Sequence, residues 1–153
     1  MDTSSNGFLA EIRPCARAVI LRKREILVQV KSKPGRGDYL SLPGGKQDPG
    51  ETLVACVIRE CEEEIGATVV VDRLLHVAET FRDKPEGMRH QLDVLFACRV
   101  PDAYVPQLGR HPDPSQTATA WVPLDEALAR LSPAFGPTLA QVDGPVYLGL
   151  CND

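Results

Sequence analysis

Short apolar runs separated by polar and turn-forming residues dominate the chain and predict a fold rich in β-strands. Residues 16–21 and 26–30 are two such runs, and the charged residues 22–25 between them favour an antiparallel hairpin. Further runs at residues 39–42, 69–77 and 92–100, together with Trp121 and Val122, have a similar composition, and residues 146–150 are expected to form a closing strand or a loop. Segments rich in Pro, Gly or polar residues predict the connecting loops, at residues 33–38, 43–50, 101–120 and 133–137.

Two segments carry helix signals instead. Residues 52–65 begin with Thr52, a residue type that caps helix N-termini, and end before Gly66, a common C-terminal signal. A second helix is predicted over residues 124–131. Strands and helices in a chain of 153 residues, 43% of them hydrophobic, indicate one α/β domain over residues 1–153. Residues 1–12 are expected to extend from it as a disordered tail.

The first predicted helix is acidic on one side. On a helical wheel with about 100° per residue, Glu60, Glu63 and Glu64 share one face, while Glu62 points to solvent. Like charges at this spacing repel, so the face must be either fully solvated or neutralised by a cation. A narrow apolar stripe beside the carboxylates, expected to pack on the sheet, comprises Val54, Ile58, Cys61 and Ile65.

The glycine-rich loop at residues 43–50 leads directly into this helix. Leu53, Cys56 and Val57 make the beginning of the acidic side apolar, so we expect the loop to pack there. Backbone carbonyls of the loop would then lie close to the glutamates and complete a set of oxygen ligands for a hard divalent cation. Mg²⁺ is the expected occupant and Mn²⁺ the alternative, and such a site can hold substrate phosphates and activate water.

Charge and composition exclude several classes of partner. The formal net charge of -4 argues against a surface for a large nucleic acid. The N-terminal segment lacks the basic flank and apolar run of a signal peptide, and no stretch is long and apolar enough to span a bilayer. We therefore expect a cytoplasmic protein without membrane contact. The five cysteines form no CxxC pair, which favours thiols in the core.

The segment GKQDPGETLVACVIRECEEEIGA, from Gly45 to Ala67, resembles the signature of the Nudix hydrolase family. That signature is a Gly, five residues, a Glu, seven residues, and then Arg-Glu-aliphatic-x-Glu-Glu-x-Gly-aliphatic. Cys61 and Ala67 occupy the two aliphatic positions. The charged and glycine positions are all matched, by Gly45, Glu51, Arg59, Glu60, Glu63, Glu64 and Gly66. So many identities at fixed spacing make this resemblance far more specific than a single glycine motif.

The resemblance implies an α/β/α sandwich with a mixed sheet and a Mg²⁺-dependent hydrolase that cuts a pyrophosphate linkage. The implied metal ligands are Glu60, Glu63, Glu64 and the backbone carbonyl of Gly45. Arg59 would pair with Glu51 and orient the carboxylates, so both belong to the implied catalytic set. Such orientation matters because freely rotating glutamates would lose affinity for the metal.

One departure from the family pattern concerns the general base. Many relatives supply an acidic residue from the loop before the tryptophan, but Gln116 stands at about that place here. Asp113 is the nearest carboxylate and would serve if the loop bends inward, and Glu79 is a third candidate. Otherwise Glu60, already an implied metal ligand, is the favoured base.

Several basic and aromatic residues are candidates for substrate binding. Arg17 alternates with alanines in the first strand, and an orientation toward solvent is favoured over one into the cleft. Arg82, Lys84 and Arg89 form a basic segment that could reach a phosphate, although an ordinary charged loop is the commoner explanation. His90 precedes a predicted strand and is expected to have a structural or an edge role. Side chains that could stack on a base, although core packing is commoner, are Tyr39, Phe81 and Trp121.

Two functions remain open on this scaffold. The first is an enzyme in which water attacks a phosphorus atom of a small nucleotide-type substrate, and the complete set of box residues favours it. The second is a noncatalytic nucleotide-binding or regulatory module, for which a lost glutamate would be expected. The resemblance leaves the substrate open among nucleoside triphosphates, ADP-ribose, nucleotide sugars, dinucleoside polyphosphates and coenzyme A, and it leaves a homodimer open as well.

Overall fold

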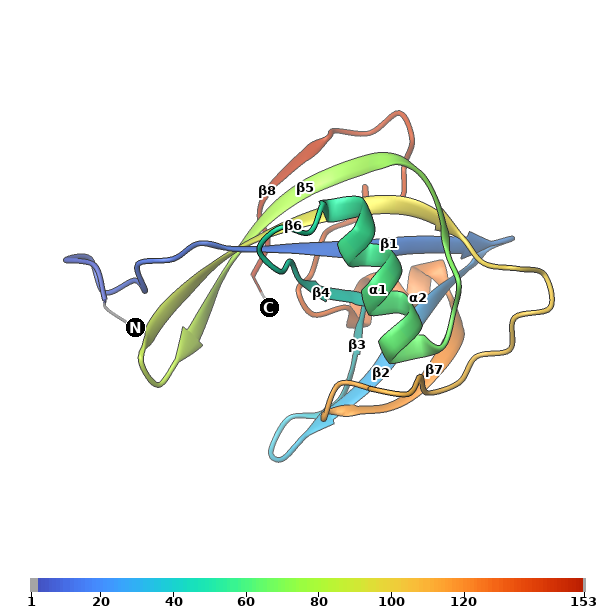
Figure 1. Ribbon diagram of the computed structural model, residues 1–153, viewed down its shortest axis with the longest axis horizontal. Helices are drawn as coiled ribbons and strands as arrows, with labels where there is room; N and C mark the ends of the chain where they lie inside the picture. Colours follow the sequence, from blue (N-terminus) through green and yellow to red (C-terminus); the bar gives the residue numbers. More distant parts are fainter. Residues whose placement is uncertain (1–2, 153) are drawn as a thin grey trace.

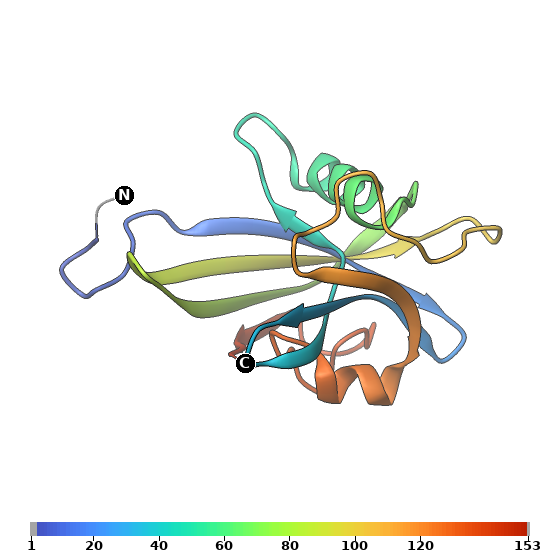
Figure 2. The same ribbon diagram turned by 90° about the horizontal axis from the view of Figure 1, so that it is seen from below.

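A computed structural model describes residues 3–152, in which a mixed sheet and two helices build the fold (Figure 1). Helix α1 covers Leu53–Ile65 and helix α2 covers Leu124–Arg130. The two helices lie on opposite faces of the strands (Figure 2). The α/β class and the mixed sheet predicted from the sequence are confirmed. Within residues 3–152, no helix is long and apolar enough to cross a membrane.

Within the described residues, eight strands precede, separate and follow these helices. They are β1 Arg13–Arg22, β2 Glu25–Lys33, β3 Gly37–Ser41, β4 Gly44–Lys46, β5 Val70–Lys84, β6 Gly87–Arg99, β7 Gln116–Pro123 and β8 Tyr147–Leu150. The main path of the sheet is β3-β2-β1-β6-β5-β8, while β4 pairs with β1 and β7 pairs with β2. The central pair, β1 with β6, is parallel, and so is the pair of β5 with β8.

The predicted hairpin of β1 and β2 forms, but its two strands stay paired only near the turn. Leu21 pairs with Ile26 and Arg22 pairs with Glu25. Beyond this point β1 pairs with β4 and β6, whereas β2 pairs with β3 and β7. The two strands therefore diverge into two parts of the sheet. Residues of β1 and of β2 line a cleft between these parts.

Two clusters of buried apolar side chains hold the layers together. One lies beneath α1 and contains Cys56, Val57 and Ile65, and the other lies beside α2 and contains Ile26 and Ala127. Burial of this apolar surface is the main favourable term in folding. All five cysteines are free and buried, which confirms the prediction of thiols in the core.

The buried face of α1 differs from the predicted apolar stripe. Val54 and Ile58, two members of that stripe, are 43% and 37% exposed, whereas Cys56 and Val57 are fully buried. On a wheel at about 100° per residue, the buried positions span about 180°, and Glu64 lies near their middle. The prediction is confirmed for Cys61 and Ile65, which are buried, and wrong for Val54 and Ile58. The packed face includes the carboxylate position Glu64, which a pattern of apolar residues assigns to solvent.

Strands β5 and β6 form a longer hairpin than the apolar pattern predicts. The predicted strands cover residues 69–77 and 92–100, but the two strands pair as far as Lys84 and Gly87, with Arg82 opposite Arg89. The basic segment is therefore part of two strands, and the explanation as an ordinary charged loop is wrong. Similarly, β4 lies inside the predicted loop 43–50, and β7 begins inside the predicted loop 101–120. Polar strand ends carry no apolar signal that could reveal them.

The segment before β1 lies against the tip of this hairpin. The Leu9 N–H donates to the Met88 carbonyl at 2.8 Å. The Phe8 ring meets the Phe81 ring edge to face, with 4.9 Å between their centroids. Of the tail predicted over residues 1–12, residues 1–2 lie outside the described residues.

Candidate active site

Helix α1 is fixed at both ends by the residues that predict it. Thr52 Oγ1 accepts a hydrogen bond from the Ala55 N–H at 3.0 Å, which is the geometry of an N-cap. Gly66 has a left-handed backbone with a φ of 63°, and its N–H donates to the Glu62 carbonyl at 3.2 Å. These caps confirm the predicted helix and fix the direction in which its acidic side chains point.

The three glutamates of α1 differ in their surroundings. The side chains of Glu60 and Glu63 are partly exposed, whereas Glu64 is buried. Glu64 Oε2 accepts a hydrogen bond from Gln29 Nε2 at 3.0 Å, but Glu64 Oε1 is buried without a hydrogen-bond partner. Burial, and then the neighbouring Glu60 carboxyl, raise the pKa of Glu64 to about 8. A cation near this carboxylate would compensate for its lost hydration.

Arg59 connects the carboxylates of α1 to the preceding loop. Its Nε and Nη2 donate to the two carboxylate oxygens of Glu51 at 2.6 and 2.9 Å, which makes a bidentate pair. Its Nη1 lies 3.1 Å from Glu60 Oε1 and 3.3 Å from Glu63 Oε2. The hydrogen bonds from Arg59 lower the pKa of Glu51 to about 2. The predicted pair of Arg59 with Glu51 is therefore present, and its orienting role stays a prediction.

Strand β4 brings the glycine-rich loop against Glu60. A Cβ atom on Gly45 would lie 2.8 Å from the Glu60 carboxylate, and one on Gly44, whose φ is 144°, would lie 2.1 Å from the Ala16 carbonyl oxygen. Gly44 therefore requires glycine, because its Cβ would meet backbone, whereas a Cβ on Gly45 would displace the Glu60 carboxylate. Cys56 Sγ lies 3.5 Å from the Gly45 carbonyl oxygen, so the loop packs on the beginning of α1 as predicted.

Glu51, Glu60 and Glu63 pair with Arg59, whereas Glu64 accepts its hydrogen bond from Gln29. Among the residues from 3 to 152, no group of three or more His, Cys, Asp or Glu is already arranged as a set of metal ligands. The structure brings Gly45 and Glu60 together and places Glu60, Glu63 and Glu64 on one helix. Their assignment as metal ligands stays a prediction.

Arg17 is buried, so the favoured orientation toward solvent is wrong. The neighbouring strand β6 supplies Asp93, whose Oδ1 accepts a hydrogen bond from Arg17 Nε at 2.8 Å. Gln91 and Thr80 also donate to the Asp93 carboxylate. The alternation of Arg17 with alanines could not reveal this because Asp93 lies far away in the sequence. Asp93 itself interrupts the apolar run of residues 92–100, and this is the signal that could have found it.

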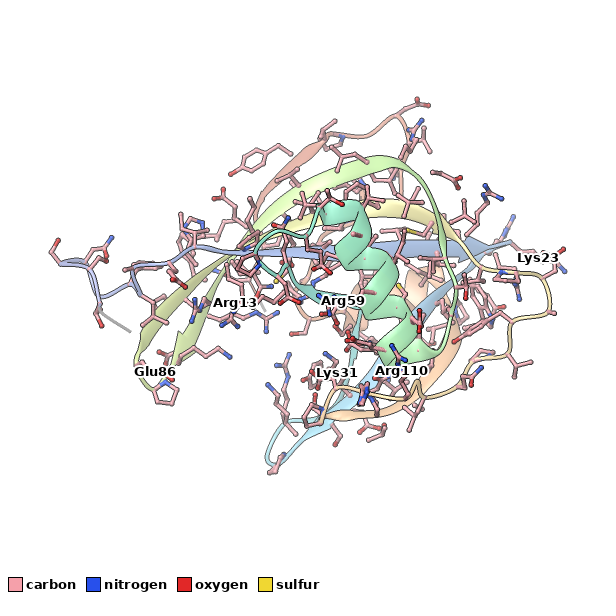
Figure 3. The ribbon with its side chains drawn as sticks, viewed as in Figure 1. Arg13, Lys23, Lys31, Arg59, Glu86 and Arg110 are labelled. Carbon is pink, nitrogen blue, oxygen red and sulfur yellow. The ribbon has the colours of Figure 1, made fainter. Side chains whose placement is uncertain are left out.

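The candidate substrate-binding arginines separate into two groups. Arg17 and Arg82 line one cleft of about 380 Å³, together with Lys31. Arg89 is buried on β6, and its Nη1 donates to the Glu11 carbonyl at 3.4 Å. Figure 3 labels Lys31 on β2 and Arg59 on α1. Arg17 pairs with Gly44 on β4, and the next residue, Gly45, lies against the Glu60 carboxylate of α1. The structure therefore brings Arg17 and Arg82 together near the acidic helix.

The loop residues considered for the general base have different partners. Gln116 Nε2 donates to the Glu64 carbonyl at 3.0 Å, so this side chain supports the end of α1. Asp113 accepts a hydrogen bond from the Ser115 N–H at 2.9 Å and lies 3.8 Å from Lys31 Nζ in the wall of the cleft. Asp113 therefore faces the cleft, whereas Gln116 is part of the structural framework.

Glu79 lies at the other edge of the sheet, where β5 pairs with β8. One of its oxygens lies 2.8 Å from His90 Nε2, and the other accepts a hydrogen bond from the Tyr147 hydroxyl. These bonds lower the pKa of Glu79, with the Tyr147 hydroxyl as the larger cause. His90 lies on β6 and has the structural contact predicted for it.

Each of the three aromatic candidates has a neighbour against its ring. The Arg36 guanidinium lies 4.1 Å from the centroid of Tyr39, and the Arg22 guanidinium lies 4.5 Å from that of Trp121. Phe81 is 38% exposed and packs against the N-terminal segment, so core packing is the wrong expectation for it. Cation–π contacts of this kind use the same ring faces that a nucleobase would need.

Comparisons with known proteins agree with this arrangement. The profile of the NUDIX domain matches residues 11–142. An ADP-ribose pyrophosphatase of Methanocaldococcus jannaschii is 35% identical over 71 residues, which are 46% of this chain and 40% of that protein. The human 8-oxo-dGDP phosphatase NUDT18 is 31% identical over 108 residues, which are 69% of this chain and 31% of that protein. The matched part is thus less than half of either relative.

The fold also resembles that of a solved structure. A NUDIX hydrolase from Nitrosomonas europaea superposes with a TM-score of 0.68 at 19% identity, and the match covers 95% of this chain and 81% of that one. At this level of identity the likeness shows the fold alone. It agrees with the two-sided arrangement of α1 and α2 around the mixed sheet.

Proposed function

Because the chain belongs to the NUDIX domain family, we propose that it is a metal-dependent hydrolase that cuts the pyrophosphate linkage of a small nucleotide-type substrate. The observation that carries this proposal is the environment of Glu64. Its carboxyl lies in the packed face of α1, has one oxygen without a hydrogen-bond partner, and adjoins Glu60. A buried carboxyl of this kind costs stability, and such perturbed groups are concentrated at functional sites.

The side chains present fit a divalent cation with oxygen ligands. Glu60, Glu63 and Glu64 supply carboxylates, and the backbone of Gly45 lies against Glu60 and offers a carbonyl. Mg²⁺ and Mn²⁺ prefer hard oxygen ligands of this type. When bound, such a cation supplies positive charge that offsets the phosphates of the substrate and the charge that develops on the leaving group.

Arg59 and Glu51 are proposed to hold the acidic side chains in position. The bidentate pair fixes the guanidinium, and the remaining Nη1 reaches Glu60 and Glu63. A glutamate with a fixed rotamer loses less conformational entropy when it binds a ligand. The same guanidinium lessens the repulsion between neighbouring carboxylates of the helix.

Glu60 is the proposed general base. In the hydrolysis, the oxygen of a water molecule bonds to phosphorus while the base takes one proton from that water. The bond from phosphorus to the bridging oxygen then breaks, and this oxygen leaves with the departing phosphate. The partial exposure of Glu60 and its position beside the glycine loop support this role. Both oxygens of Glu79 already have partners, which makes it the weakest of the three candidates.

The test is a screen of nucleoside triphosphates, ADP-ribose and nucleotide sugars with Mg²⁺ or Mn²⁺, in which the products are identified. Glu63→Gln should lower turnover by about a hundredfold or more. Glu62→Gln is the matched control, because the Glu62 carboxylate comes from the residue next to Glu63 but is exposed and pairs with Arg110. It should leave turnover within about twofold. Hydrolysis that persists in a chelator, or equal turnover of both variants, would contradict the proposal.

A further inference from the structure

The cleft beside the acidic helix is strongly cationic although the whole chain has a net charge of -4. Its volume of about 380 Å³ falls within the range typical of sites for small molecules. Among the charged side chains in its wall, Asp113 supplies the single carboxylate. The cations in its wall are Arg13, Arg17, Lys31, Lys33, Arg82 and Lys84.

Three strands each contribute two of these cations. Lys31 and Lys33 are two residues apart on β2, as are Arg82 and Lys84 on β5, and Arg13 lies four residues before Arg17 on β1. Side chains at even spacing along a strand point to the same face. The pairs therefore face one cleft by strand geometry. Figure 3 shows Arg13 beside the β5–β6 hairpin, where it pairs with Gln91 of β6.

Most of these cations lack an acidic partner. Arg17 pairs with Asp93, and Lys31 lies 3.8 Å from Asp113. In the part of the chain that the structure describes, no ion pair forms at Arg13, Lys33, Arg82 or Lys84. The Nε atoms of Arg13 and Arg82 are buried without a hydrogen-bond partner.

This crowding of like charges disfavours the charged form of the lysines in the cleft. Partial burial, and then the positive charges of Arg82, Lys33 and Arg13, lower the pKa of Lys84. Burial and the charge of Arg17 lower that of Lys31 in the same way. An unliganded cleft of this kind destabilises the folded protein, and an anion of high charge would relieve it.

The cleft also adjoins the proposed catalytic carboxylates. Arg17 on β1 pairs with Gly44 of β4, and the next residue, Gly45, lies against the Glu60 carboxylate. Burial opposes the charge on Arg17, but the charges of Asp93 and Glu64 favour it, and the pKa of Arg17 is raised. The charge of Glu64 also acts on Lys31. A group bound between these cations would therefore lie next to the site where the pyrophosphate is cut.

We propose that this cleft binds phosphate groups beyond the two of the scissile pyrophosphate, so that the preferred substrates are polyphosphorylated small molecules. The proposal rests on the proposed function and adds the substrate class to it. Arginine and lysine side chains recognise phosphate by charge-assisted hydrogen bonds. The candidate aromatic rings already lie against Arg36, Arg22 or Phe8, so the cleft selects by phosphate charge more than by the base.

The first experiment compares substrates that differ only in phosphate number. We would measure kcat/KM for ADP, ATP and adenosine tetraphosphate, and for ADP with an additional 3′-phosphate, at fixed free Mg²⁺. In the wild type, kcat/KM should rise about tenfold or more from ADP to the best of the other three. The tetraphosphate and the 3′-phosphate compound distinguish a linear chain of phosphates from phosphates on another part of the substrate. The double variant Arg82→Gln/Lys84→Gln should lose this rise.

The matched control is Arg24→Gln, which removes an exposed positive charge in the turn between β1 and β2. It should keep the wild-type ratio. Because the double variant removes repulsion within the cleft, its melting temperature should not fall, which separates a lost binding site from a lost fold. Equal kcat/KM for ADP and all three compounds in the wild type would overturn the proposed substrate class while leaving the hydrolase intact.

The second experiment does not depend on catalysis. Isothermal titration of the metal-free protein with inorganic tripolyphosphate should show binding that weakens about tenfold or more in Arg82→Gln/Lys84→Gln and stays unchanged in Arg24→Gln. If this holds while no nucleotide is hydrolysed, the proposed function fails and the phosphate-binding cleft stands. Identical affinities of the wild type and the double variant would overturn the cleft proposal, whatever the enzyme hydrolyses.

Discussion

Replacement of Glu64 by Gln is predicted to abolish activity and yet to stabilise the metal-free protein at neutral pH. Glu64 is buried, one of its oxygens has no partner, and the Glu60 carboxyl is its neighbour. Burial and this neighbour raise the folded-state pKa of Glu64 above its ordinary value. The folded state therefore holds the proton more tightly than the unfolded state, and stability is lost as the pH rises between the two pKa values.

The size of the effect follows from these two values. The pKa of Glu64 is about 8 in the folded protein, against an ordinary value of 4.5. In the unfolded chain, pH 7 lies two and a half pH units above the pKa of Glu64, and each unit is worth about 1.4 kcal/mol. In the folded protein, the Glu64 side chain is still mostly neutral at this pH. The ionisation of Glu64 thus favours unfolding by up to about 3 kcal/mol at pH 7. A domain of this size has a total stability of about 5–15 kcal/mol.

Urea unfolding from pH 5 to pH 8, with a chelator and a thiol reductant at constant ionic strength, measures this effect. The unfolding free energy of Glu64→Gln should exceed that of the wild type by an amount that increases with pH. Saturating Mg²⁺ should reduce the difference, because it stabilises the wild type more than the variant. Glu62→Gln, at an exposed position of the same helix, should show no such trend. A difference between Glu64→Gln and wild type that is constant across this pH range would show that the ionisation of Glu64 does not destabilise the folded protein.

Three further predictions concern the surroundings of the acidic helix. Arg59→Lys keeps the charge but loses the bidentate pair, so affinity for Mn²⁺ in a titration should fall about 10- to 100-fold, and unchanged affinity would remove its positioning role. Gly45→Ala should lower turnover with little change in melting temperature, because its Cβ meets the Glu60 side chain. Gly44→Ala should lower the melting temperature, because its Cβ meets backbone, and the same outcome at both glycines would contradict this distinction. Asp113→Asn should cost less than about tenfold in turnover, whereas a hundredfold loss with intact metal affinity would make Asp113 the base.

The parts of the site that the sequence predicts are those fixed by local spacing. Thr52 and Gly66 determine where α1 begins and ends, and both act through backbone hydrogen bonds within a few residues. Arg59 and Glu51 are separated by about two helical turns and a cap, so their pairing also follows from a short segment. The glycine loop packs on Cys56 for the same reason. Local geometry leaves few alternatives at these positions.

The parts that the sequence misses depend on strands distant in the chain. Arg17 is buried because β6 runs parallel to β1 and supplies Asp93, and no pattern within β1 contains that information. The cationic cleft likewise requires the divergence of β1 from β2 and the extension of β5 to Lys84. Pairing between distant strands determines both, whereas the alternation of apolar residues reports only one face of each strand.

Polar residues that interrupt apolar patterns are the common element of the site. Gln29 lies within the apolar run of β2, Arg17 within β1, Asp93 within β6, and Glu64 within the packed face of α1, and all four are buried. Hydrogen bonds join Gln29 to Glu64 and Arg17 to Asp93, so each interruption has a partner on another element. Local sequence rules tend to fail where function requires it. Among these four residues, Gln29 Oε1 and Glu64 Oε1 are buried without a hydrogen-bond partner. Glu64 is the one of these two residues that ionises, so the unfolding free energy of Glu64→Gln measures directly how much the site destabilises the fold.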